Sequence, residues 1–199
     1  MANELTMALW SKVAEQIERS DHLLSLIPLD KLSWRPSLLD GFGTALDGFG
    51  AATDRGRRNA ENNCAAAALF SIGELLGHMM DCMAGFCAAL YKIDPLRLEH
   101  LSGLRALPVN HFCEVEEARE RMNEYSARIK EGFALLTDDV LTRVLPTVFV
   151  PTGEPALTVL LGNLEHVINH KFQLFMYLRL LGLPVSTRDL YRFREINSI

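Results

Sequence analysis

The chain has 199 residues, of which 49% are hydrophobic and 23% charged, and its formal net charge is -5. This length and composition are typical of one globular domain with a substantial core. The mild acidity argues against nucleic-acid binding, which depends on a basic surface, since the one dense basic cluster is the short run Arg55, Arg57 and Arg58.

The four cysteines, Cys64, Cys82, Cys87 and Cys113, form no CxxC pair, and the first twenty residues are amphipathic rather than signal-like. The simplest interpretation is free thiols in a reducing cytoplasm, although four cysteines could form two bridges. No apolar run reaches the roughly 18 residues of a membrane span. We therefore expect a cytoplasmic protein that contacts neither nucleic acid nor membrane.

Apolar residues at three- and four-residue steps predict a first helix, which Pro28 ends; they are Trp10, Val13, Ile17, Leu24 and Ile27. Residues 38–63 follow, with two copies of LDGFG and a polar stretch. We interpret them as a loop insertion, and a flap over a pocket is the alternative.

The second helix has a clear start. Ser71 and Glu74 form a capping box, and Phe70 and Leu75 occupy the positions of a hydrophobic staple. The helix continues through GELLGHMMDCMAGFCAALY. A third helix is predicted by another periodic set: Ala118, Met122, Tyr125, Ile129, Phe133 and Leu136.

The segment VLPTVFVPTGEP is rich in β-branched residues and proline, which indicates an extended excursion or a small ribbon. A fourth helix is expected from about Pro155 to Gly182. The tail, residues 183–199, carries several apolar side chains that could pack on the body or on a second subunit, and a homodimer is our interpretation; they are Leu190, Tyr191, Phe193 and Ile196.

Four amphipathic helices of about twenty residues predict an all-α, four-helix bundle spanning residues 1–199 as a single domain. We expect an antiparallel-type arrangement, with long connections between helices 1 and 2 and between helices 3 and 4.

His166 and His170 lie four residues apart in the fourth helix and therefore share one face. His78 lies in the middle of the second helix, on the same side as Cys82, Gly85 and Ala89. Bundles build metal sites from inward-facing residues on neighbouring helices, so these three histidines are the candidate ligands. The alternative is that each histidine merely bridges core and solvent.

Neutral imidazole binds zinc, nickel, copper or ferrous iron, and three protein ligands leave coordination positions open, as in catalytic sites. Two neighbours of His78 have more than one interpretation. Asp81 could orient a ligand or take a proton, or it could be a surface carboxylate. Cys82 is either a soft ligand or a small buried hydrophobe, and the second interpretation is the simpler one.

The motifs SIGELLGHMMD and HVINHKFQLFMYLRLLG, with the early LIPLDKLSWRP, resemble the DinB-like superfamily. This superfamily of metal-binding four-helix bundles includes thiol-dependent S-transferases and maleylpyruvate isomerases. The resemblance implies that His78, His166 and His170 are the metal ligands, and Gln173 and the sequence YLRLLG at 177–182 hold the register. It covers nearly the whole chain apart from the insertion and the tail.

The resemblance implies a divalent metal (zinc, nickel or iron) and a low-molecular-weight thiol as cofactors. The function it implies is a metal-dependent enzyme that is S-transferase-like or hydrolase-like and acts on a small-molecule substrate. A non-catalytic bundle that binds metal or only dimerises is the alternative. One departure is Lys171-Phe172, where relatives have Arg-Gly after the second histidine, so we expect altered backbone packing there.

Overall fold

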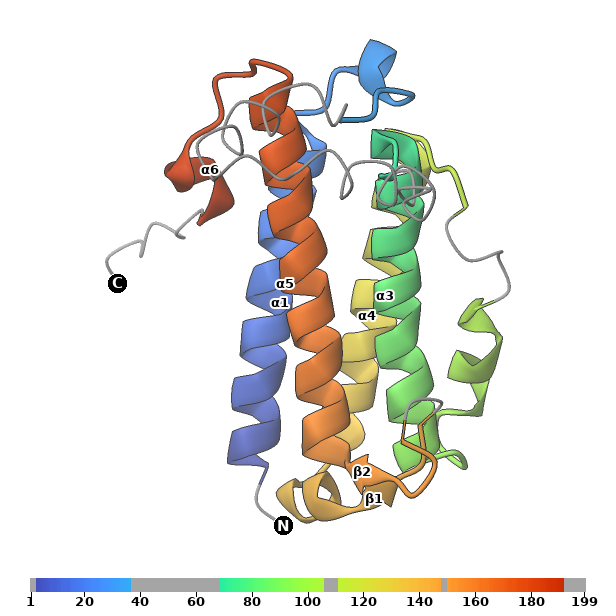
Figure 1. Ribbon diagram of the computed structural model, residues 1–199. Helices are drawn as coiled ribbons and strands as arrows, with labels where there is room; N and C mark the ends of the chain where they lie inside the picture. The colour runs from blue at the N-terminus through green and yellow to red at the C-terminus, as the bar shows by residue number, and fades with distance from the viewer. Residues whose placement is uncertain (1–2, 37–68, 106–110, 148–149, 192–199) are drawn as a thin grey trace, which may run out of the picture.

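The computed structural model describes residues 3–36, 69–105, 111–147 and 150–191. Four long helices lie side by side as a bundle (Figure 1): α1 (Glu4–Leu24), α3 (Ile72–Ile93), α4 (Val115–Leu135) and α5 (Ala156–Leu180). The predicted all-α, four-helix architecture is confirmed. The predicted insertion, residues 38–63, lies outside the described residues.

The directions of the helices differ from the expected antiparallel arrangement. Helices α1 and α5 run one way, and α3 and α4 both run the other way (Figure 1). The start of α4 lies beside the start of α3, where the Cys113 amide donates to the Gly73 carbonyl oxygen at 3.0 Å. The expectation was therefore wrong for α3 and α4. The two helices run in the same direction because the connection between them, residues 94–114, is long enough to return the chain to the end of the bundle where α3 starts. This connection includes the 3-10 helix η2 (Glu99–Arg105).

Helix α3 packs on both α4 and α5, as α1 also does, and its contacts with these two helices are the more extensive. It is apolar on almost every side, as a helix buried on several faces must be. Its start is fixed by the predicted capping box: the Glu74 amide donates to Ser71 Oγ, and the Ser71 amide donates to Glu74 Oε2. Arg35 donates to the same carboxylate at 2.7 Å and so ties the first connection to the cap.

A short ribbon closes one end of the bundle. Strands β1 (Val144–Leu145) and β2 (Glu154–Pro155) pair antiparallel, with Leu145 opposite Glu154. The 3-10 helix η3 (Asp138–Thr142) precedes them. At this end Asp138 accepts from the Thr6 amide and hydroxyl, which anchors the start of α1. The predicted ribbon is therefore present, and it sets the direction in which α5 begins.

The chain turns back after α5 at Gly182, whose φ of 78° favours glycine. The short helix α6 (Thr187–Leu190) then lies against α1, and His22 Nε2 and Asp189 Oδ1 are 3.2 Å apart. Leu190 is buried in its own chain, whereas Phe193 and Ile196 lie outside the described residues. The homodimer stays a prediction, and it now depends on fewer apolar residues of the tail, because Leu190 is already covered.

Among the described residues, no helix combines the length and hydropathy that crossing a membrane requires.

Two glycines on α3 let the segment before α4 lie directly on the helix. A Cβ on Gly77 would lie only 1.5 Å from the carbonyl oxygen of His111, and a Cβ on Gly73 would meet the ring of Phe112 at 2.4 Å. At Gly77 the neighbouring atoms belong to the backbone of His111. A side chain at position 77 could therefore not be accommodated by a rotamer change in a neighbour, and the backbone would have to move.

Gly77→Ala is therefore expected to lower the free energy of unfolding by about 1–3 kcal/mol or more, because the 111–113 segment must move off α3. Urea unfolding followed by circular dichroism measures this. Gly162→Ala is the matched control, since the added Cβ would have no neighbour within 4 Å apart from the adjacent residues and backbone of its own helix. It should be neutral or stabilise α5 by up to about 1 kcal/mol. Equal stability of Gly77→Ala and the parent would contradict the close contact.

Candidate metal centre

The candidate site lies where α3 and α5 face each other in antiparallel directions. On α3, positions 78, 82, 85 and 89 form one stripe, and on α5 positions 159, 163, 166 and 170 form a stripe with the same spacing. His78 lies opposite His170, with ring centroids 4.4 Å apart. Further along, a Cβ on Gly85 would lie 2.8 Å from Asn163 Oδ1, so glycine allows the helices to approach.

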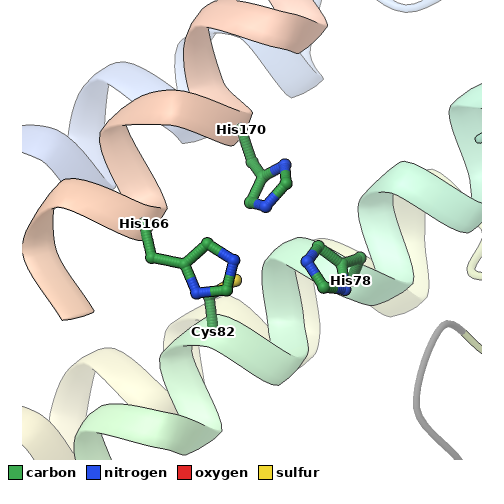
Figure 2. A group of neighbouring side chains, drawn as sticks. All are labelled: His78, Cys82, His166 and His170. Carbon is green, nitrogen blue, oxygen red and sulfur yellow. The ribbon is translucent and has the colours of Figure 1, made fainter. Parts of the chain in front are cut away.

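The three predicted histidines converge between these helices. The rings of His78 and His166 are 5.3 Å apart, and those of His166 and His170 are 4.7 Å apart. One ring nitrogen from each histidine and the Sγ atom of Cys82 all lie within 4.8 Å of one another. Figure 2 shows the three imidazole rings turned toward a common centre, with Cys82 beside His166. The structure thus groups four potential metal donors, two from each helix.

A chain of hydrogen bonds orients His170. Its Nδ1 lies 2.9 Å from Gln173 Oε1, which can only accept, so Nδ1 carries the proton and Nε2 carries the lone pair. Gln173 Nε2 in turn donates to the Tyr177 hydroxyl at 2.9 Å, and the Tyr177 ring packs edge-on against Trp34. Outer partners of this kind fix the tautomer and orientation of ligating histidines. In the sequence motif Gln173 only holds the register, and the structure shows that its side chain also orients His170.

The electrostatics keep two of the histidines neutral. Burial lowers the pKa of His166 below 6.5, and the charge of nearby His78 lowers it further. Burial also lowers the pKa of His170, against the opposing effect of its hydrogen bond to Gln173. Neutral imidazole is the form that binds metal. The donor set therefore fits a divalent ion at neutral pH, with His78, His166, His170 and Cys82 as the side chains within reach.

A cavity of about 530 Å³ opens beside the cluster. His78, Cys82 and His166 line one end of it, and Gly85 and Ala89 line its α3 wall as the sequence suggested. Its other end lies against the ribbon and is lined by Lys92, Leu145, Pro146, Thr147 and Glu154. The volume is within the range of about 300–1,000 Å³ that is common for small-molecule sites.

The structure shows the surroundings of three residues that lie near His78 on α3: Asp81, Cys82 and Glu74. Asp81 is only 8% exposed and lines the cavity, so the interpretation as a surface carboxylate is wrong. Cys82 joins the histidine cluster, although the sequence favoured a purely apolar role. Glu74 shares the face of His78 but is engaged by the helix cap and by Arg35. None of the described cysteines, Cys82, Cys87 and Cys113, forms a disulfide.

The Lys171-Phe172 departure lies away from the cluster. Phe172 is 49% exposed, so its ring is not enclosed between helices, and the expected change in backbone packing stays a prediction. Lys171 is 2% exposed and donates to Gln16 Oε1 on α1 at 2.8 Å. Burial lowers the pKa of Lys171 to about 8. The sequence had no signal for this buried lysine, because its partner is distant along the chain.

Comparison with known proteins supports the fold. No model of a protein family matches this sequence, and no curated protein matches it. Among solved structures, the crystal structure of a DinB-like protein, YjoA, from Bacillus subtilis is similar, with a TM-score of 0.56 and 17% sequence identity. The match covers 89% of this chain and 96% of that chain. The chain has the DinB-like fold, as the sequence resemblance implied.

The lowered pKa values of His166 and His170 make stability depend on pH in the metal-free protein. The unfolded chain binds protons near pH 6.5 and the folded chain only at lower pH, so stability should fall as the pH drops below about 6.5 and level off once the pH is below the two folded-state pKa values. Carboxylates with lowered pKa values, such as that of Glu74, change the free energy of unfolding only at more acidic pH, where they become protonated.

Chemical denaturation in the presence of a chelator, at several pH values, measures this slope. The double variant His166→Gln, His170→Gln should lose most of it, because glutamine does not titrate. His100→Gln, which alters a histidine of η2 that pairs with Glu131 on α4, should keep this slope. The same slope in the parent and the double variant would contradict the assignment.

Proposed function

We propose that this chain is a metal-dependent enzyme of the DinB-like superfamily, in which His78, His166 and His170 hold one divalent ion. The observation that carries the proposal is the convergence of the three ring nitrogens within 4.8 Å, at the end of a cavity of small-molecule size. The DinB-like fold of the chain supports it as an analogy between folds.

An ion held by these histidines would stabilise the anionic form of a bound water or thiol, bringing the pKa of water toward about 7. The protein's own groups would prepare the site. Gln173 keeps His170 Nε2 unprotonated and aimed into the cluster, since it binds the proton on Nδ1. Asp81 lines the same cavity and is the carboxylate that we assign to accept a proton from the nucleophile or to orient it.

The shape of the cavity indicates an extended substrate or cofactor. Both His78 and Lys92 line it, and they are separated by about 21 Å along α3 at 1.5 Å per residue. Between them the lining combines apolar side chains, Ala88, Ala89 and Val159, with the polar side chains of Thr158 and Asn163. A small molecule that reaches the metal ligands at one end would therefore meet Lys92 and Glu154 at the other. This fits a thiol conjugation or a hydrolysis of a low-molecular-weight compound.

A non-catalytic metal-binding bundle is the second candidate. Four donor side chains, rather than three, gather at the cluster, and four protein ligands are typical of structural zinc sites. Measurements of metal content and turnover on the same samples separate the two candidates.

Untagged protein loaded with one equivalent of zinc, nickel or ferrous ion should retain it through gel filtration. It should then catalyse either thiol conjugation to a chloronitrobenzene or hydrolysis of an activated ester. His166→Ala should bind metal at least about tenfold more weakly, since even loss of an outer partner costs that much, and its rate should fall to background. His100→Ala is the matched control and should keep both metal and rate.

Two outcomes are informative against the proposal. If the parent retains none of the three metals, the site itself is wrong. If metal is retained and neither reaction exceeds the rate of the His166→Ala variant, the enzyme is rejected and the non-catalytic candidate stands.

A further inference from the structure

Cys82 differs in its surroundings from the other described cysteines. It is 4% exposed, it lines the cavity, and its Sγ belongs to the group of donors formed with the three histidines. Cys87 lies five positions further along α3 and is fully buried, and burial raises its pKa to about 12. Cys113 also has its pKa raised to about 12 by burial. Those two thiols stay protonated in the core, where they act as small apolar groups.

The arrangement of the four donors is symmetrical between the helices. His78 and Cys82 are i and i+4 on α3, and His166 and His170 are i and i+4 on α5. Each helix thus presents two donors one turn apart, on the faces that meet (Figure 2). In a tetrahedral zinc site, bond lengths of about 2.0–2.3 Å place neighbouring ligand atoms about 3.3–3.6 Å apart. The cluster, within 4.8 Å, needs only small side-chain rotations to contract that far.

We propose that Cys82, as a thiolate, is a fourth protein ligand of the ion, so that the donor set is three imidazoles and one sulfur. This inference rests on the proposed metal site and deepens it. Sulfur is a soft ligand that favours zinc, ferrous iron or cobalt over magnesium and manganese. The set therefore selects a thiophilic metal.

The thiolate also changes what the ion can do. Its negative charge offsets part of the charge of the ion, so a bound water would be acidified less than at a site of three neutral histidines. Four protein ligands fill a tetrahedral shell, and binding of a substrate would then require expansion to five ligands, as some catalytic zinc sites allow. Cys82 thus determines how open the site is to molecules in the cavity.

Cobalt(II) titration of the reduced, untagged protein tests the proposal, because a thiolate ligand gives an intense near-ultraviolet charge-transfer band and histidine alone does not. The parent, Cys87→Ser and Cys64→Ser should show the band at one equivalent of cobalt. Cys64 is included because it lies outside the described residues. Cys82→Ser should lose the band, keep the weaker visible cobalt bands, and bind at least about tenfold more weakly.

Each outcome has a separate meaning. Cobalt binding in the parent without the charge-transfer band overturns the role of Cys82 and leaves the three-histidine site standing. Absence of any cobalt binding overturns the metal site and this inference with it. If Cys82→Ser fails to fold, the triple variant Cys64→Ser, Cys87→Ser, Cys113→Ser leaves Cys82 as the last thiol among the four cysteines. The band in that variant supports the proposal, and its absence overturns it.

Discussion

The close antiparallel approach of α3 and α5 is the constraint on which the site depends. Short side chains on the α3 stripe permit it, most directly at Gly85, where a Cβ would lie 2.8 Å from Asn163 Oδ1. The same short side chains leave the cavity beside the histidines, because Gly85 and Ala89 fill little of the space between the helices. Larger residues at these positions would separate the helices and the two pairs of donors.

The rest of the fold holds α3 in place for this contact. The capping box fixes where the helix starts, and therefore which side of it His78 occupies. The segment before α4 rests directly on the backbone of α3 at Gly77 and so covers a second side of this helix. Polar side chains in such a seam cost free energy relative to apolar packing. Polar residues that lower stability in this way are most often found at binding or catalytic sites.

Much of this could be predicted because its determinants are local. The capping box, the ribbon before α5 and the histidine spacing each depend on a few adjacent residues, and all three appear in the structure. The parallel direction of α3 and α4 could not be predicted, since it depends on the path of the connection 94–114. The sequence also does not predict that Cys82 joins the histidine cluster or that Lys171 is buried against Gln16. Helical spacing assigns a residue to a face, but the donors or acceptors opposite that face come from distant segments.

The claim that the three histidines hold a metal ion is tested most directly by anomalous diffraction. Crystals of untagged protein grown with one equivalent of zinc would be measured on both sides of the zinc absorption edge. The account predicts one strong anomalous peak between α3 and α5, at coordination distance from ring nitrogens of His78, His166 and His170. Zinc found only at surface positions, with the three imidazoles hydrogen-bonded to water or to one another, would contradict it.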